Sequence, residues 1–216
     1  TINQNDAGAH TFTLGSLNNT GTFNANAGST DIGGTVTQSG TVRVAAGAVF
    51  GVPGGFTNAA SGTLTGAGTV ATGGGTLTNL GNIVPGTVGT AATLSVAGNL
   101  AMSSGTLTLD LGGTAAAASD RVAVSGNAAL GGTVNAALIG GYTPVDGDFI
   151  PVVTSGGTAT GTFALPTFPG GFTAGYNLAA GEAARLIFGA AGTRVFSNAA
   201  GDLNWATPAN WGGSLP

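Results

Sequence analysis

The sequence predicts an all-β protein, a right-handed parallel β-helix (β-solenoid) of roughly 20 residues per coil with a C-terminal β cap. Three observations carry this prediction: a short repeated motif, an extreme glycine content and a near absence of charge. The chain of 216 residues holds 42 Gly and 8 Pro, and only 6% of its residues are charged. Ordinary globular proteins carry about 25% charged residues.

The repeated motif is Gly-Thr followed by an apolar residue, and it predicts short strands. Around it, polar and apolar residues alternate with the period of a strand, as in Thr63-Leu64-Thr65 and Thr106-Leu107-Thr108. The closest copies are six or seven residues apart. The motif occurs at Thr22-Phe23, Thr35-Val36, Thr41-Val42, Thr63-Leu64, Thr69-Val70, Thr76-Leu77, Thr106-Leu107, Thr133-Val134 and Thr162-Phe163.

Strands this short cannot build a hairpin sandwich, because a spacing of six residues leaves no useful length on both sides of a turn. Stacking each strand on its equivalents one coil above and below solves this problem. Three faces of six or seven residues give about 20 residues per coil. Glycine fits the corners, and asparagines such as Asn58, Asn79, Asn82 and Asn99 tolerate left-handed turns. Stacked asparagine side chains can also satisfy the backbone groups of the turns.

We therefore expect a parallel β-helix over residues 1–140. Charged residues and longer apolar segments reappear after residue 110, which predicts a β cap or a longer-strand continuation over 141–191. The segment 192–216 contains both tryptophans and is predicted to be a connector between modules. In it, Trp205 and Trp211 are the expected contacts to a neighbouring module or subunit, with a sugar-stacking platform as the alternative.

Composition excludes several classes of function. The net charge is -4 and every basic residue is Arg, so no basic surface for nucleic acid is expected. The chain has no Cys, which excludes disulfides, thiol nucleophiles and Cys-based metal sites. No apolar run is long enough to cross a membrane as a helix. The absence of Cys is compatible with an extracellular location.

A family resemblance lies in residues 62–150. The matching pieces resemble the β-strand repeats of autotransporter passengers and related giant bacterial surface adhesins, and the ending Trp205…Asn210-Trp211-Gly-Gly is similar to the segment that opens each module in tandem adhesins. The resemblance implies a secreted module at the bacterial cell surface. The pieces are Gly62–Val70, Asn82–Gly86, Leu94–Leu100, Gly105–Leu111, Ser119–Val124, Leu130–Val134 and Gly141–Ile150.

Few residues suggest chemistry. The acidic pairs that lie close in sequence are Asp146/Asp148 and Asp110/Asp120. Asp146-Gly-Asp148 could share a hard cation, but a turn in which Asp caps backbone amides is the favoured reading. His10 is the only histidine, so neither a triad with a second base nor a two-His metal site can be built. We expect no enzyme activity, no cofactor and no metal.

Two alternative functions remain. A parallel β-helix can also bind or cleave carbohydrates, so a carbohydrate-binding or polysaccharide-cleaving protein is the main alternative. Ice binding would need the pairs Thr35/Thr37, Thr63/Thr65, Thr76/Thr78 and Thr106/Thr108 on one face, and their spacing does not fit multiples of about 20 residues.

The predicted function is that of a non-catalytic structural or adhesive module of a secreted bacterial surface fibre, serving as a rigid stalk or a self-assembling unit. The expected partners are tandem or neighbouring copies of the same module, in a homo-oligomeric filament, together with surface glycans or a host or neighbouring cell surface.

Overall fold

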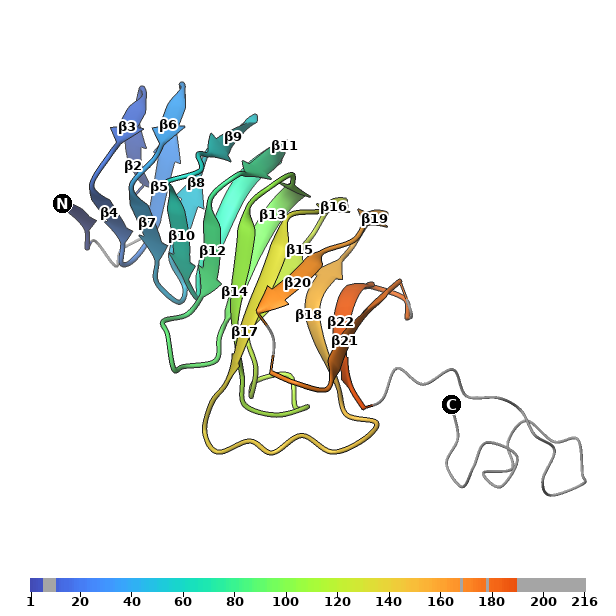
Figure 1. Ribbon diagram of the computed structural model, residues 1–216. Coiled ribbons are helices and arrows are strands. Elements are labelled where there is room, and N and C mark those ends of the chain that lie inside the picture. The colour runs from blue at the N-terminus through green and yellow to red at the C-terminus, as the bar shows by residue number, and fades with distance from the viewer. Residues whose placement is uncertain (6–10, 168, 178, 190–216) are drawn as a thin grey trace, which may run out of the picture.

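The computed structural model describes residues 1–5, 11–167, 169–177 and 179–189. Over these residues the chain forms strands and turns and no helix, which confirms the all-β prediction. The strands belong to one eight-stranded and one fourteen-stranded sheet, and most neighbouring strands are parallel. In Figure 1 strands from successive parts of the chain lie side by side along the body, from blue to orange.

Parallel pairing runs in three ladders. The first ladder is the eight-stranded sheet; the second and third form the larger sheet, because β11 and β13 bend from one ladder into the next. The first ladder comprises β1 (Ile2–Gln4), β4 (Thr22–Ala25), β7 (Thr41–Val44), β10 (Thr63–Gly66), β12 (Asn82–Pro85), β14 (Thr106–Leu111), β17 (Thr133–Leu138) and β20 (Ala164–Thr167).

The other two ladders share the strands β11 (Thr69–Asn79) and β13 (Thr93–Met102). The second ladder contains their first halves together with β2 (Thr11–Leu14), β5 (Ser29–Ile32), β8 (Val49–Gly51), β15 (Arg121–Val124) and β18 (Phe149–Ser155). The third ladder contains their second halves together with β3 (Leu17–Asn19), β6 (Val36–Gln38), β9 (Gly55–Asn58), β16 (Ala128–Leu130) and β19 (Ala159–Gly161).

Antiparallel pairing begins after the parallel strands. The strand β22 (Glu182–Phe188) runs antiparallel to β18 and to β21 (Phe172–Tyr176). The predicted boundary at residue 140 falls between β17 and β18, and parallel pairing continues beyond it through β18, β19 and β20. The predicted connector 192–216, with Trp205 and Trp211, lies outside the described residues.

The separation in sequence between paired strands grows along the chain. Ile2 pairs with Phe23, and Thr22 pairs with Thr41, so the first coils have the predicted length. Further on, Thr133 pairs with Ala164, which makes this late coil about half as long again. The predicted coil length is therefore right for the first coils and wrong for the last ones. The added residues lie in long loops, which lengthen a coil at little entropic cost and leave the pairing intact.

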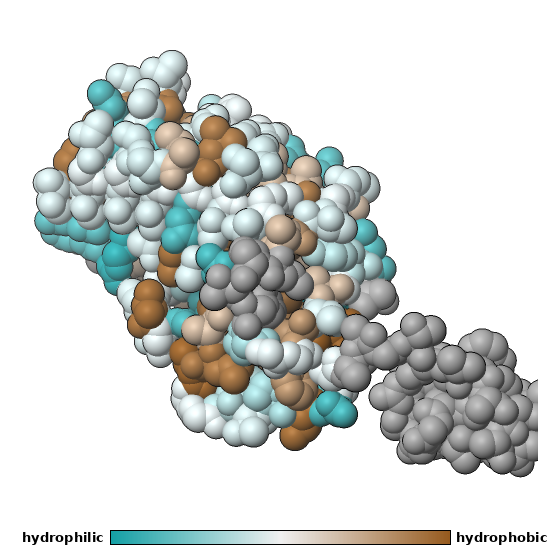
Figure 2. All heavy atoms as spheres, in the orientation of Figure 1, coloured by the Kyte–Doolittle hydropathy of each residue, from teal (hydrophilic) through white to brown (hydrophobic). Residues whose placement is uncertain are grey.

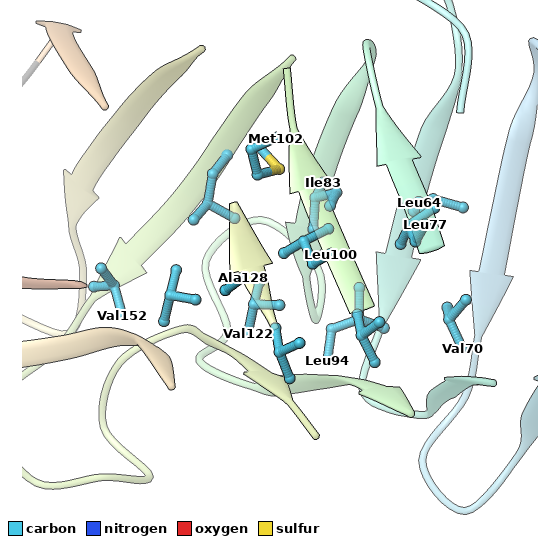
Figure 3. Packing of buried hydrophobic residues seen from close by; sticks show 14 of the residues in the cluster. Leu64, Val70, Leu77, Ile83, Leu94, Leu100, Met102, Val122, Ala128 and Val152 are labelled. Atoms are coloured by element: carbon cyan, nitrogen blue, oxygen red, sulfur yellow. The ribbon is translucent and has the colours of Figure 1, made fainter. Parts of the chain in front are cut away.

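The three ladders face one apolar core. Along the strands buried and less buried residues alternate, as the period of two predicts, and Leu64, Leu77 and Ile83 are fully buried. Figure 3 shows side chains of this kind from β10, β11, β12 and β13 pointing toward one another. Near the N-terminal end, Phe50 contacts Phe23 and Phe56 edge to face, with ring centroids 5.6 and 5.8 Å apart. These rings come from all three ladders, so the ladders contribute to a common core.

In five of its copies the Gly of the repeated motif stands at the corner where the chain enters the first ladder, and Gly81, which is followed by Asn82, holds the same place. The residue after each later corner glycine donates its backbone N–H to the carbonyl oxygen of the corner glycine one coil earlier, for example Thr106 to Gly81 at 2.7 Å. A Cβ on any of these glycines but the first would collide with the preceding coil, usually with its glycine carbonyl. We call Gly21, Gly40, Gly62, Gly81, Gly105 and Gly132 the glycine ladder.

A row of buried amides lies beside the glycine ladder. The row comprises Asn19, Gln38, Asn58 and Asn79, which occupy one register position in successive strands of the third ladder. Asn58 donates to Asn79 Oδ1 at 2.7 Å, and Asn79 donates to the carbonyl of Gly81 at 3.0 Å. Stacked asparagines therefore do satisfy turn groups, as at Asn58 and Asn79. The prediction of left-handed turns at the four named asparagines is wrong, because among the described non-glycine residues a positive φ occurs at Asn177 alone. Asn82 and Asn99 lie elsewhere: Asn82 faces outward, and Asn99 donates to Gly74 O on an exposed edge.

The glycine ladder generates a stability prediction. Replacing Gly81 with Ala places a Cβ against the carbonyl oxygens of Gly62 and Ala59, so the coils must separate locally. We expect the free energy of unfolding, measured by urea denaturation, to fall by about 1–3 kcal/mol. Gly21→Ala is the matched control: it occupies the first position of the same ladder, and its Cβ would meet nothing within 4 Å. Equal losses in the two variants would contradict the role of close stacking.

Candidate functional site

Most of the residues that the sequence analysis named as candidates do not meet at one site in the structure. Trp205, Trp211 and His10 lie outside the described residues. The glycines Gly73 and Gly74 adopt positive φ at the register shift inside β11, where the strand bends from the second ladder into the third. They therefore serve a corner of the sheet.

Asp146 and Asp148 form a turn. The Asp148 carboxylate accepts hydrogen bonds from the Tyr142 hydroxyl at 2.7 Å and from the Val145 backbone N–H at 3.0 Å. The bond from Tyr142, and then that from Val145, lowers the pKa of Asp148, whereas burial and this carboxylate raise the pKa of Tyr142 to about 12. Within the described residues no group of three or more His, Cys, Asp or Glu side chains could hold a metal ion.

The threonine pairs do not share one face. Thr63/Thr65 and Thr106/Thr108 lie in the first ladder, whereas Thr76/Thr78 lie in the third. Between the two pairs of the first ladder stands β12, which contributes Asn82 and Val84 to the same rows. The sequence argument compared the spacing of the pairs with a constant coil length. In the structure the pairs also lie in different ladders, so no single face carries all of them.

Asp110 and Asp120, in contrast, come together. Asp110 lies on the outward-facing side of β14, and Asp120 directly precedes β15. The backbone N–H of Asp110 donates to Asp120 Oδ2 at 2.9 Å, and the backbone N–H of Asp120 donates to the Asp110 carbonyl at 2.8 Å. Although both side chains are acidic, they are 6% and 1% exposed. This burial is unusual for unpaired carboxylates.

The two carboxylates hold the loop 86–92 over the sheet. Asp110 Oδ2 accepts the backbone N–H of Gly89 at 2.5 Å, and Asp120 Oδ1 accepts that of Ala92 at 2.7 Å. The loop carries Val88, which is 83% exposed. Asp120, at the entrance of β15, therefore caps backbone amides, and the neighbouring Arg121 donates its Nε–H to the carbonyl of Pro151 at 3.2 Å.

A cavity of about 240 Å³ lies beside these carboxylates, and we call it the Asp pocket. It opens on the outer face of the first ladder, where the loop 86–92 overhangs β12, β14 and β17. Its lining residues are Val84, Val88, Thr108, Leu109, Asp110, Asp120, Asn135, Ala136 and Ala137. Figure 2 shows a largely pale surface on which brown, hydrophobic atoms gather toward the lower edge, where Figure 1 shows the long loops.

The electrostatics of the Asp pocket are dominated by desolvation. Burial raises the pKa of Asp120 to about 7, even though the backbone N–H groups of Asp110 and Ala92 favour its ionised form and oppose the rise. The negative charge of Asp110 raises the pKa of Asp120 further. The pocket therefore holds a carboxyl that changes its charge near neutral pH.

Sequence reasoning noted Asp110 and Asp120 as a pair but missed their neighbours. Asn135 pairs with Thr108 across the first ladder, and its Oδ1 is buried without a hydrogen-bond partner. Val88 belongs to a loop whose fold depends on the carboxylates. One signal in the sequence pointed to this site: acidic residues reappear at 110 and 120 after a long uncharged stretch. In a chain with so few charges, a buried charged residue needs specific hydrogen-bond partners.

Comparison with known proteins found no matching family model, no matching curated protein and no matching solved structure. Among the described residues, no helix is long and apolar enough to cross a membrane.

The raised pKa of Asp120 generates a prediction about pH and stability. Between about pH 4 and 7 the folded chain keeps a proton on Asp120 that the unfolded chain releases, so stability falls as pH rises. We expect the free energy of unfolding in urea to drop by about 3 kcal/mol from about pH 4.5 to about pH 8 because of this group. Asp120→Asn should remove that part of the slope.

The matched control for this experiment is Asp146→Asn, which removes an exposed carboxyl. It should leave the pH slope of the wild-type chain in place. If the free energy of unfolding of Asp120→Asn falls with rising pH as steeply as that of the wild type, the Asp120 carboxyl does not have a raised pKa in the folded protein.

Proposed function

We propose that this chain is a right-handed parallel β-helix with a C-terminal β cap, and that it acts as a non-catalytic structural or adhesive module of a secreted bacterial surface fibre. The single observation that carries the proposal is the run of three parallel ladders in which each strand lies on its equivalent one coil earlier. Eight strands at about 4.8 Å make a stack on the order of 34 Å long. Antiparallel β21 and β22 serve as the cap.

The surface chemistry supports an extended module better than a compact binding protein. No charged residue occurs between Arg43 and Asp110 in the sequence, so Thr, Ser and Asn provide most of the polar contact with water there. Backbone ladders and a narrow apolar core stabilise such a rod without a charged surface. A rigid spacer needs this shape and needs no catalytic group.

Assembly with neighbouring copies follows from the strand edges. Among the described strands β1 stands at the end of the first ladder and pairs with β4, and the end strand of a sheet is the place where a further strand can be added. We propose that this edge stacks on a neighbouring module, in tandem or in a homo-oligomeric filament. Surface glycans or a neighbouring cell surface are the proposed targets of the assembled fibre.

Sedimentation velocity over a range of protein concentrations tests the assembly. Wild-type protein should form elongated species as concentration rises. Ile2→Lys places a charge on the exposed part of β1 and should shift the equilibrium to monomers, whereas Val145→Lys adds the same charge to an exposed loop and should not. Monomers at every concentration, or equal effects of the two variants, would contradict assembly through this edge.

A further inference from the structure

The Asp pocket has a lining that the structural role does not use. Its polar lining residues are Asp110, Asp120, Asn135 and Thr108. Asn135 Oδ1 is buried and has no hydrogen-bond partner, which is costly unless a ligand or water supplies a donor. The Thr108 hydroxyl donates to Asn82 Oδ1 at 3.0 Å, so its hydrogen is engaged. The pocket therefore offers mainly acceptors.

The rest of the lining is aliphatic. Val84, Val88 and Ala137 present methyl groups, whereas Leu109 and Ala136 alternate toward the core and border the cavity from beneath; among the described residues no aromatic ring or cationic side chain lines it. A sugar ring gains from an aromatic platform and from donors as well as acceptors around the ring. These are lacking here. An aliphatic stem with a positively charged head matches both the apolar wall and the acceptors.

We propose that the Asp pocket binds an alkylammonium group, the group that ends a lysine side chain or an aliphatic amine. The stem packs against Val84, Val88 and Ala137, and the ammonium donates to Asp110, Asp120 and Asn135 Oδ1. An ammonium has three donors and no acceptor, so it can serve all three groups at once. This inference goes beyond the structural role and does not depend on it.

The side chains of these 216 residues do not supply the ligand. The chain has four basic residues, all Arg, and no Lys, so a second copy of this sequence cannot supply an alkylammonium side chain. Charge complementarity favours such a ligand, because two buried carboxyls lie side by side and the nearest basic residue in sequence, Arg121, is bonded to the Pro151 carbonyl. Pairing a buried carboxylate with a cation offsets part of the cost of burying its charge.

Binding is expected to depend on pH. The titratable groups that line the cavity are Asp110 and Asp120, and the burial of Asp120 favours its neutral form below about pH 7. A bound cation favours the ionised carboxylate, so affinity should rise as pH increases through neutrality, and binding should release a proton from Asp120.

The test is a titration of the ¹⁵N-labelled protein with n-butylammonium chloride, followed by amide chemical shifts. Saturable shifts should appear at Gly89, at Ala92 and at the Asn135 side-chain amide. Butan-1-ol and methyl glucoside serve as the neutral probes, one aliphatic and one saccharide. Equal or tighter binding of either neutral probe, or no saturable shift with butylammonium, would overturn the proposal.

Two variants make the assignment specific. Asp110→Asn removes a charge and should weaken butylammonium about tenfold or more. Because Asp110 also holds the loop at Gly89, Asn135→Leu provides a second test, which removes the unpaired acceptor and leaves the loop contacts in place. It should weaken binding about tenfold while the remaining spectrum is unchanged. Asp146→Asn should bind like the wild type; weakening in this control as large as in Asp110→Asn would indicate a general charge effect and refute the site.

A final comparison distinguishes the source of the ligand. Nα-acetyl-lysine methylamide presents the same ammonium from a peptide backbone. Tighter binding of this compound than of n-butylammonium would assign the pocket to lysine side chains of a partner polypeptide, and tighter binding of n-butylammonium would assign it to free amines. Either order of affinities supports alkylammonium recognition. Nα-acetyl-norleucine methylamide has the same kind of backbone but no charge, and it should not compete with n-butylammonium. Competition by this compound would contradict the need for the ammonium.

Discussion

The close stacking of one coil on the next is the constraint on which the rest of the structure depends. Parallel strands share backbone hydrogen bonds only when they lie about 4.8 Å apart, and a corner must keep that spacing as well. The glycine ladder satisfies this requirement, because Gly40, Gly81, Gly105 and Gly132 each leave room for the carbonyl oxygen of the preceding corner glycine. The motif Gly-Thr-apolar thus combines a corner, an outward hydroxyl and an inward apolar side chain in three consecutive residues.

The close stacking of the corners also allows a row of amide side chains to be buried, because each amide lies within hydrogen-bond distance of a neighbouring amide. The amide row at Asn19, Gln38, Asn58 and Asn79 lies beside the glycine corners, whose carbonyl oxygens accept a side-chain N–H in addition to the backbone N–H of the next strand. Amides donate along the row and to these carbonyls. At the next coil Met102 takes the same register position. The row therefore belongs to the short N-terminal coils, and the later coils use an apolar residue there.

Lengthening of the coils is what makes a pocket possible. In the short coils the chain turns tightly from one ladder into the next and leaves little outside the strands. In the later coils the added residues form loops such as 86–92, and one of these folds back over the outer face of the first ladder. Asp110 and Asp120 hold it through two backbone amides. A uniform rod would offer only a flat face, so the site depends on the departure from regularity.

The sequence by itself determined the all-β class, the short strands, their inward and outward faces and the parallel stacking, because these follow from local period and from the lack of length for hairpins. It also indicated that stacked asparagine side chains would satisfy turn groups, but not which asparagines would do so. It did not determine the growth of the coils, since loop length has little effect on pairing. Which threonines share a face, and the meeting of Asp110, Asp120 and Asn135, depend on register between distant strands. That register is fixed by the packed core and by the stacked corners, so only the tertiary structure decided it.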